Sequence, residues 1–248
     1  RGVDMKYMGS KARIAKHILP IILEKRKDGQ FYVEPFVGGA NLIDKVDGNR
    51  IGSDINKYLI SALEKIRDEP NELPANKTEA NEDLYKRAKN GLFSQGLKGY
   101  YGFALSYGGK WFGGWCRDKE GKRDYVAEAY RNAVKQSPFL KGISFKKDSY
   151  DELLIPNNSI IYCDPPYEGT TKYKDKFNHE LFWSWCREMT RKGHSVFISE
   201  YNAPSDFKCI WEKDITSSLT KNTGSKRATE KLFKWEAELA HGKEVWND

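Results

Sequence analysis

The chain has 248 residues, of which 31% are charged and 39% hydrophobic, and its formal net charge is +7. No apolar run approaches the roughly 20 residues that cross a bilayer, and no signal peptide is visible. The composition therefore predicts a soluble globular protein with one large domain, or one domain with an insertion. The four cysteines and four histidines are scattered. This argues against a zinc site or a disulfide framework and indicates a reducing cytoplasm.

The first expected element is a helix whose apolar residues recur at helical spacing from Ile14 to Ile22. It follows an opening segment, Met5–Lys11, in which Gly9 and Ser10 make a turn. Ser10 can cap the helix that follows. A surface turn without further role is the alternative interpretation of this segment.

A glycine loop follows the first expected strand, Phe31-Tyr32-Val33, and reads Glu34-Pro35-Phe36-Val37-Gly38-Gly39-Ala40-Asn41. Glycines between a strand and a helix allow the backbone to come close to a ligand. The loop does not have the Gly-x-Gly-x-x-Gly pattern of dinucleotide-binding proteins. A plain glycine turn is the alternative.

An acidic residue, Asp54, ends the second expected strand at residues 50–53 and lies 16 residues after Gly38. In nucleotide-binding folds, an acidic residue about 20 residues after the glycine loop accepts hydrogen bonds from ribose hydroxyls. Asp54 or Asn56 could instead cap the helix that runs through residues 59–66. The two roles are compatible.

A polar stretch with two prolines, residues 68–81, indicates a boundary, and a basic, aromatic block follows. Residues 85–147 carry 14 Lys and Arg against 4 Asp and Glu, a net charge of +10, so the rest of the chain sums to −3. The block also holds 13 aromatic residues, and its densest part, residues 100–117, suggests glycine-rich loops that carry recognition side chains. Interleaved cations and aromatics predict a nucleic-acid surface. A basic solvated face over an ordinary aromatic core is the alternative.

The end of this block is expected to contain a loop tip or hairpin around Gly121 and a helix over residues 125–135. A strand, Ile143-Ser144-Phe145, follows and ends at Asp148. An aspartate of an ordinary turn is an equal alternative to a functional role for Asp148.

The run Ile160-Ile161-Tyr162 predicts a buried strand, and Asp164-Pro165-Pro166-Tyr167 comes directly after Cys163. Two prolines cannot continue a central strand, so the chain leaves the sheet at the edge where open α/β sheets bind ligands. Carbonyl acceptors, a carboxylate and an aromatic ring suit a planar ring that carries an amino group. A turn whose aspartate caps the next helix is the alternative.

The remaining elements are a polar, lysine-rich loop at residues 168–176, a helix over 180–191 and a strand over 195–199. A loop with Lys221, Lys226 and Arg227, at residues 216–230, precedes the last expected strand, residues 231–235. Phosphate contact and a disordered surface loop remain alternatives for residues 216–230.

The opening segment, the glycine loop, Asp54, the basic block and Asp-Pro-Pro-Tyr, in this order, resemble the Dam-type DNA adenine-N6 methyltransferases of the D12 class over residues 5–235. One departure is Ala40, which holds the second glycine position of the family's Phe-x-Gly-x-Gly pattern. The resemblance implies a Rossmann-like α/β fold that binds S-adenosylmethionine, with an inserted, mostly helical and loop target-recognition domain. Residues 5–68 and 143–235 would form the catalytic domain and residues 69–142 the recognition domain, while residues 236–248 have no assigned role.

Three sets of site residues follow from the motifs and the resemblance. The catalytic set is Asp164, Pro165, Pro166 and Tyr167. The cofactor-binding set is Tyr7, Lys11, Glu34, Phe36, Gly38, Gly39, Asp54, Asp148 and Asp164. The DNA-contact set is Lys110, Arg117, Lys119, Lys122, Arg123, Lys226 and Arg227. No metal is implied.

The expected function is site-specific methylation of the N6 amino group of adenine in double-stranded DNA, with S-adenosylmethionine as methyl donor and with base flipping. We expect a cytoplasmic protein of a bacterium or phage-infected cell that acts as a monomer or weak dimer on DNA and needs no membrane. Cytosine-N4 methylation, RNA as substrate, and a non-catalytic nucleic-acid-binding protein on a methyltransferase fold are the alternatives. The recognition sequence stays open, although the resemblance suggests GATC.

Overall fold

The computed structural model describes residues 4–118, 120–167, 177–216 and 227–236. The chain divides into two compact units, one of residues 1–19 and 31–154 and the other of residues 20–30 and 155–248. The first helix, α1 (Ala15–Leu23), has residues in both units.

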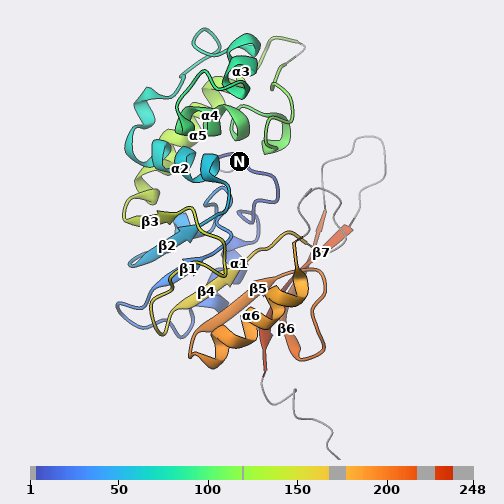
Figure 1. The fold of residues 1–248 in the computed structure, drawn as a ribbon. Helices are drawn as coiled ribbons and strands as arrows, with labels where there is room; N and C mark the ends of the chain where they lie inside the picture. Colours follow the sequence, from blue (N-terminus) through green and yellow to red (C-terminus); the bar gives the residue numbers. More distant parts are fainter. Residues whose placement is uncertain (1–3, 119, 168–176, 217–226, 237–248) are drawn as a thin grey trace, which may run out of the picture. The chain divides into compact units, whose positions relative to one another are not determined.

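Three short parallel strands form the sheet of the first unit, in the order β3-β2-β1 (Figure 1). They are β1 (Tyr32–Glu34), β2 (Arg50–Ser53) and β3 (Ile143–Lys146). Every residue of β1 is buried, as expected of a strand covered on both faces. Because the three strands are parallel, their carboxyl ends meet at one edge, where Phe36, Asp54 and Asp148 follow.

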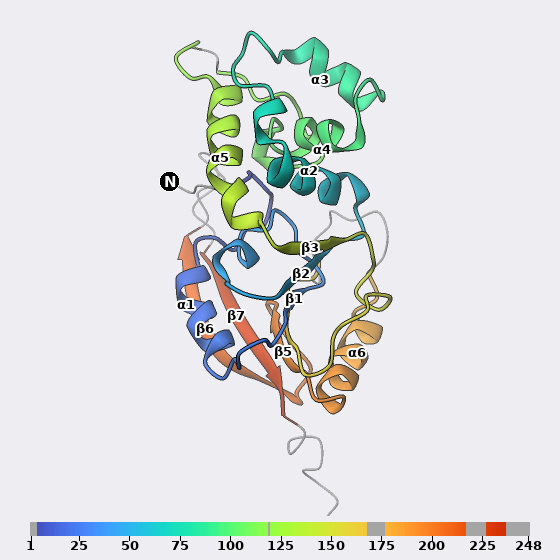
Figure 2. The same cartoon turned by 90° about the vertical axis from the view of Figure 1, so that its left-hand side faces the viewer.

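Four α-helices of the first unit gather beyond β3 in both views (Figures 1 and 2). They are α2 (Lys57–Asp68), α3 (Glu82–Lys89), α4 (Gln95–Phe103) and α5 (Tyr125–Leu140). Three short 3₁₀ helices also belong to this unit: η1 (Ile43–Lys45) between β1 and β2, η2 (Pro70–Glu72) between α2 and α3, and η3 (Tyr107–Gly109) between α4 and α5. In α2 the buried residues, among them Leu59, Leu63 and Ile66, recur at helical spacing, so the helix presents one apolar stripe to its neighbours.

Helix α4 corrects the expectation of glycine-rich loops over residues 100–117, because residues 100–103 belong to the helix. A Cβ atom at Gly99 would lie 1.9 Å from the carbonyl oxygen of Tyr58, and a Cβ atom at Gly102 would lie 2.3 Å from the Trp111 ring. The glycines therefore allow α4 to approach α2 and an aromatic ring closely. Glycine in a helix interior costs only about 1 kcal/mol relative to alanine, so tertiary packing can override its low helix propensity here.

The strands of the second unit have the order β4-β5-β7-β6. The parallel pair is β4 (Ile160–Cys163) and β5 (Ser195–Ser199), and the antiparallel strands are β7 (Arg227–Trp235) and β6 (Phe207–Thr216). Helix α6 (His179–Arg191) packs against β5. Its buried residues include Phe182, Trp185 and Cys186, which recur at helical spacing.

Five expected strands are confirmed, but two elements at the carboxyl end differ. β7 begins at Arg227 rather than at residue 231, and β6 was not predicted. Both strands are rich in charged residues, as an antiparallel pair can be when one face is solvated. The loop predicted at residues 216–230 is therefore wrong for Thr216 and for residues 227–230, while residues 217–226 and the predicted loop at 168–176 lie outside the described residues.

Seven strands and six α-helices among the described residues make a mixed α/β protein, which confirms the expected fold class. The inserted recognition domain and its boundaries remain predictions. No helix within the described residues is long and apolar enough to cross a membrane.

Candidate active site

The loops after β1, β2 and β3 are tied together at the carboxyl edge of the first unit. The Val37 amide donates to the Ser53 carbonyl oxygen at 2.8 Å. The Ser53 hydroxyl donates to the Asp148 carbonyl oxygen at 2.7 Å and accepts from the Asp148 amide at 3.2 Å. The Phe36 ring stacks on Tyr150, with 5.5 Å between ring centroids. Three residues of the predicted cofactor set, Phe36, Asp54 and Asp148, therefore follow strand ends that are held together.

Asp54 is fixed at the end of β2 by backbone donors. Its carboxylate accepts from the Asn56 amide at 2.9 Å and from the Gly38 amide. Burial raises the pKa of Asp54 from 3.8 to about 6, and the two backbone hydrogen bonds lower it only in part. The N-cap of α2 is Asn56, which accepts from Tyr58 and Leu59. The capping role that was open between Asp54 and Asn56 thus belongs to Asn56.

The two glycines of the loop pack against the opening segment. A Cβ atom at Gly38 would lie 2.8 Å from Cε1 of Tyr7, and one at Gly39 would lie 2.7 Å from the Tyr7 Cβ. A Cβ atom at Gly109, in η3, would lie 2.8 Å from the Tyr7 Cα. These glycines make room for Tyr7. Ala40, at the departure from the family pattern, has a φ of +56°, so the backbone there adopts a left-handed conformation without glycine.

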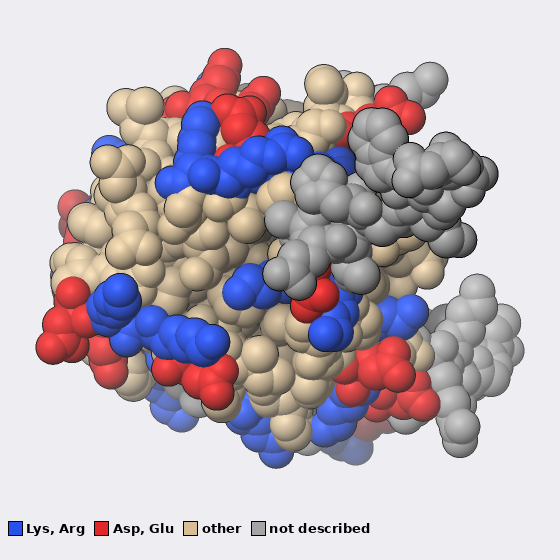
Figure 3. Space-filling model, turned by 90° about the horizontal axis from the view of Figure 1, so that it is seen from below, with Lys and Arg blue, Asp and Glu red and all other residues tan. Residues whose placement is uncertain are grey.

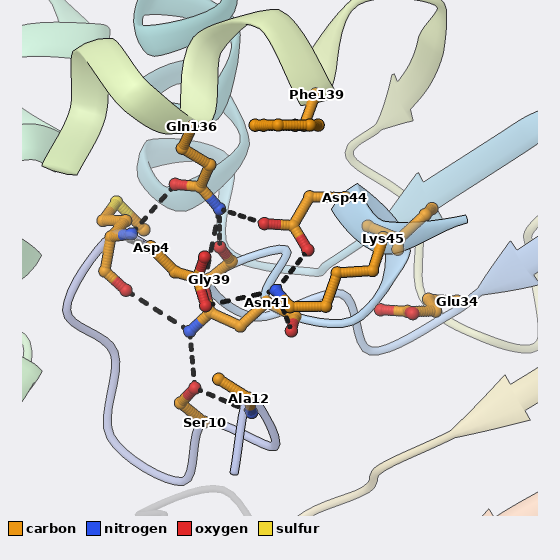
Figure 4. A network of polar contacts seen from close by, with 12 residues as sticks. Asp4, Ser10, Ala12, Glu34, Gly39, Asn41, Asp44, Lys45, Gln136 and Phe139 are labelled. Carbon is orange, nitrogen blue, oxygen red and sulfur yellow. Dashed lines mark hydrogen bonds and ion pairs between the residues drawn. The ribbon is translucent and has the colours of Figure 1, made fainter. Parts of the chain in front are cut away.

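Gln136 of α5 joins the glycine loop to the opening segment (Figure 4). Its Nε2 donates to the Gly39 carbonyl oxygen at 3.1 Å and to Asp44 Oδ2 at 3.3 Å, while its Oε1 accepts from the Met5 amide at 2.9 Å. The Gln136 side chain is buried. Because buried polar groups without partners are costly, this arrangement fixes the backbone that carries Gly38 and Gly39.

Asn41 extends this network toward Ser10, to whose hydroxyl it donates at 2.7 Å. Helix α1 begins only at Ala15, so the expectation that Ser10 caps it is wrong. Burial raises the pKa of Asp44 to about 6, and the Lys45 ammonium, 2.8 Å from Oδ1, opposes this shift.

Lys11 and Glu34 of the predicted cofactor set are both buried. Glu34 accepts a hydrogen bond of 2.8 Å from the Tyr32 hydroxyl, so part of its acceptor capacity is used inside the protein. Both residues lie in the first unit, but the contacts described do not assign either of them a ligand.

The predicted catalytic corner lies in the second unit, directly after the buried strand β4. The Tyr167 hydroxyl donates to Glu230 Oε2 at 3.1 Å, and its ring meets Tyr201 edge-on, with 4.5 Å between centroids. The Pro166 carbonyl oxygen lies 2.9 Å from His179 Nε2. Burial raises the pKa of the Tyr167 phenol well above its usual value, and the negative charges of Asp164 and Glu230 add to this shift.

Sequence reasoning missed Gln136, Glu230 and His179. Gln136 carries a detectable signal, because it is a polar residue on the buried face of α5 with Ala133 and Leu140. Glu230 was assigned to a loop, and no local pattern marks His179.

The predicted DNA-contact arginines are exposed but paired with acidic neighbours. Arg123 makes two hydrogen bonds to Glu128, of 2.9 and 2.7 Å, and Arg117 lies 3.0 Å from Glu82. Lys122 pairs with Glu120 at 2.6 Å. These side chains would have to exchange an acidic partner for a phosphate.

Lysines without an acidic partner lie elsewhere in the same unit. Within the described part of the chain, the Lys110 ammonium makes no hydrogen bond or ion pair, although the Lys110 backbone bonds to Tyr107 and Gly113. The ammonium groups of Lys57 and Lys98 lie 5.2 and 5.0 Å from the centre of the Tyr58 ring, which stacks on Trp111. On the face shown in Figure 3, by contrast, basic and acidic side chains are interspersed.

Three predicted DNA-contact residues cannot be placed as side chains. Lys119 and Lys226 lie outside the described residues, and Arg227 is the first residue of β7, with a side chain outside the description. No cluster of three or more His, Cys, Asp or Glu side chains suited to a metal ion occurs among the described residues.

Comparison with known proteins gives one family. No curated protein matches the chain. Residues 7–104 match the family model described as D12 class N6 adenine-specific DNA methyltransferase. The match covers less than half of the chain and includes the cofactor set from Tyr7 to Asp54, but it ends before Asp164. Over these residues the chain carries the pattern of the D12 class adenine-specific DNA methyltransferases, which confirms the resemblance seen in its motifs.

Proposed function

We propose that this protein transfers a methyl group from S-adenosylmethionine to the N6 amino group of adenine at specific sites in duplex DNA. The observation that carries the proposal is the corner Asp164-Pro165-Pro166-Tyr167, which follows a buried strand and has its tyrosine fixed by Glu230. The family match supports adenine methylation of DNA in general. Use of this cofactor, base flipping and site specificity belong to the proposal.

Asp164 and the Pro165 carbonyl would act on the amino group of the base. The lone pair of the adenine N6 is delocalised into the ring, so the amine is a weak nucleophile. Two acceptors that bind its N–H groups favour a more tetrahedral nitrogen whose lone pair is available. Positioning and electrostatics then supply most of the rate enhancement. A strong base is not needed, because a methylated cationic amine loses its proton easily.

Tyr167 would hold the base after it has left the helical stack. Enzymes that modify a base inside a duplex first rotate it out into a pocket. An aromatic ring that stacks on the extruded base contributes roughly 1–3 kcal/mol. In this protein the Tyr167 hydroxyl is already hydrogen-bonded to Glu230, and the Tyr167 ring makes a T-shaped contact with Tyr201.

The donor and acceptor set of the first unit fits S-adenosylmethionine. When bound, this cofactor supplies the methyl group from a sulfonium centre. Asp54 is a carboxylate at a strand end whose orientation is fixed by two backbone amides, and it would accept hydrogen bonds from the ribose hydroxyls. Phe36, Asp148 and the backbone of Gly38 would complete the nucleoside contacts. Tyr7 and Lys11 would serve the methionine end, as the family resemblance implies.

The test is product identification with a matched catalytic variant. Wild type, Asp164→Ala and the control Asp151→Ala, an exposed aspartate, would be incubated with radiolabelled cofactor and duplex DNA, and digested nucleosides would be separated. We expect N6-methyladenine from the wild type and the control, and a loss of at least about 100-fold for Asp164→Ala, because acceptors aimed at the reacting group supply factors of this size. Circular dichroism would show whether the variant is folded.

Other products would point to the alternative functions. Detection of N4-methylcytosine would identify cytosine, not adenine, as the target base. Preferential methylation of RNA in a competition assay would identify RNA, not DNA, as the substrate. Cofactor binding without methylation of any nucleic acid would support a non-catalytic protein. Sequencing of genomic DNA from expressing cells, with detection of modified bases, would define the recognition sequence.

A further inference from the structure

Two side chains from outside the Asp164–Tyr167 corner hold it in place. Glu230 comes from β7, and His179 is the first residue of α6. Both are more than ten residues from the corner in sequence, and both contact it through hydrogen bonds. Neither residue is part of the motif that defines the catalytic set.

Glu230 fixes the tyrosine. Its side chain is buried, and Oε2 accepts the Tyr167 hydroxyl at 3.1 Å. The Tyr201 ring makes a T-shaped contact with the same ring, with 4.5 Å between centroids. Because both its hydroxyl and its ring have fixed contacts, Tyr167 keeps a defined ring plane, and a base can stack on it without the cost of restricting the rotation of the tyrosine. Such pre-organisation lowers the entropic cost of binding.

His179 fixes the second proline. A carbonyl oxygen can only accept a hydrogen bond, so the 2.9 Å contact with Pro166 requires a proton on His179 Nε2. Glu200, which is buried and directly follows β5, has Oε1 3.8 Å from the same nitrogen. A carboxylate beside Nε2 favours a proton on that nitrogen, which is the proton that the contact with Pro166 requires.

We propose that Glu230 and His179 are positioning residues for methyl transfer: Glu230 sets the plane of the Tyr167 ring, and His179 holds the Pro166 peptide. The Pro165 carbonyl and Asp164 are then presented to the amino group in a constant geometry. This inference rests on the proposed function for its catalytic consequence, but the contacts themselves lie entirely within the second unit.

A double-mutant cycle tests the role of Glu230. Tyr167→Phe keeps the stacking ring and removes the hydroxyl, while Glu230→Ala removes its acceptor. We expect each variant to lower kcat about tenfold, the factor for one hydrogen bond to a charged group, with little change in cofactor affinity. The double variant should be no slower than either single variant, because all three lack the same bond.

Conservative and control variants separate positioning from a general structural effect. Glu230→Gln retains an acceptor and should keep most of the activity. Thr229→Val, one residue earlier on β7, removes a hydrogen bond of 2.7 Å to Asp214 and should leave kcat unchanged. For the histidine, His179→Phe should lower kcat, and His179→Gln, which keeps an N–H donor, should recover part of the loss. Losses that multiply in the Tyr167/Glu230 double variant, or wild-type kcat in Glu230→Ala, would overturn the inference.

A second measurement does not depend on activity. In protein labelled with 3-fluorotyrosine, the ¹⁹F resonance of Tyr167 can be assigned by its absence in Tyr167→Phe. We expect this resonance to shift and broaden in Glu230→Ala but not in Thr229→Val. If the wild type proves inactive on DNA while the resonance responds, the contact stands and the proposed reaction fails. An unchanged resonance overturns the inference even if methylation is confirmed.

Discussion

The glycine-loop region and the basic loop both carry predicted site residues, but the two regions differ in the burial and the pairing of their polar groups. The glycine-loop region comprises residues 36–45 with the opening segment and Gln136, and its polar groups are largely buried and paired through the backbone. The basic loop comprises residues 110–124, and its charged side chains are largely exposed and paired with acidic neighbours.

This contrast separates two kinds of binding site. Contacts in the glycine-loop region are shielded from water, so each lost partner leaves a buried polar group unsatisfied. Ion pairs in the basic loop are screened by solvent and salt, and each contributes little free energy to stability. Another anion, such as a phosphate, can therefore take the place of the carboxylate. We therefore expect substitutions in the first region to affect folding and cofactor binding, and those in the second to affect DNA binding with a strong dependence on salt.

The largest effect is expected at Gln136. Gln136→Leu leaves the Met5 amide and the Gly39 carbonyl without their buried partner and removes a donor to Asp44. We expect the free energy of unfolding to fall by roughly 3 kcal/mol or more. Urea denaturation would measure it. The control is Lys135→Ala, the exposed preceding residue of the same helix, which should change it by less than about 0.5 kcal/mol. Equal effects for both variants would remove the proposed distinction between the regions.

Asp54→Asn should separate stability from cofactor affinity. The loss of a charge-assisted ribose contact should weaken S-adenosylmethionine binding by roughly 1.5–3 kcal/mol, as measured by calorimetry. Because burial raises the pKa of Asp54 to about 6, the charged form is disfavoured in the folded protein at neutral pH. The variant without cofactor should therefore be more stable than wild type at pH 7, and a lower melting temperature would contradict this.

The raised pKa of Asp54 also predicts a pH dependence. Between 3.8, the ordinary pKa, and about 6, the folded protein binds this proton more tightly than the unfolded chain. The contribution of Asp54 to stability thus falls as pH rises through this window. Cofactor affinity should change in the opposite direction and decrease below pH 6, where the carboxylate becomes protonated. Asp54→Asn should lose that part of the pH dependence, and a parallel decrease in the variant would assign it to another group.

Two glycines with left-handed backbone allow a matched comparison of the two regions. Gly38 has a φ of +50° and Gly121 a φ of +68°, but only at Gly38 would a Cβ atom meet a neighbour, the Tyr7 ring at 2.8 Å. Gly121→Ala should cost about 1 kcal/mol of unfolding free energy through backbone strain alone. Gly38→Ala should cost about 1–3 kcal/mol more through overpacking and should also weaken cofactor binding. If the two variants have equal melting temperatures, the contact with Tyr7 does not constrain the loop.

The sequence predicted the elements that depend on local pattern. The apolar run before Asp164 and the expected strand at residues 50–53 placed Asp164 and Asp54 at strand ends, where the structure has them. It did not predict α4, because the close approach of α2 that requires Gly99 is a long-range contact. Gln136 and Glu230 were missed for the same reason, since their partners lie 97 and 63 residues away.

The smallest effects are expected in the basic loop, where Arg123 is held by Glu128. Arg123→Ala should reduce the steepness of the dependence of log affinity on log salt by about 0.9 if the guanidinium neutralises one phosphate. Glu128→Gln removes the competing carboxylate and should raise DNA affinity by a few-fold at low salt. Glu128→Gln in the Arg123→Ala background should give a smaller gain in DNA affinity. In that background there is no guanidinium to release, so the substitution only removes a negative charge near the DNA.

The control for long-range charge is Glu120→Gln, which removes the same negative charge from the partner of Lys122. Duplex affinity would be measured over a salt series for each variant and compared with Lys110→Ala, whose ammonium has no acidic partner among the described residues. If Lys110 contacts a phosphate, it binds without breaking an ion pair, so its loss should reduce affinity more than the loss of Arg123. If the slope of log affinity against log salt is instead identical in Lys110→Ala, Arg123→Ala and wild type, the DNA lies away from the basic loop. The contrast between exchangeable and fixed contacts would then not describe how this protein binds DNA.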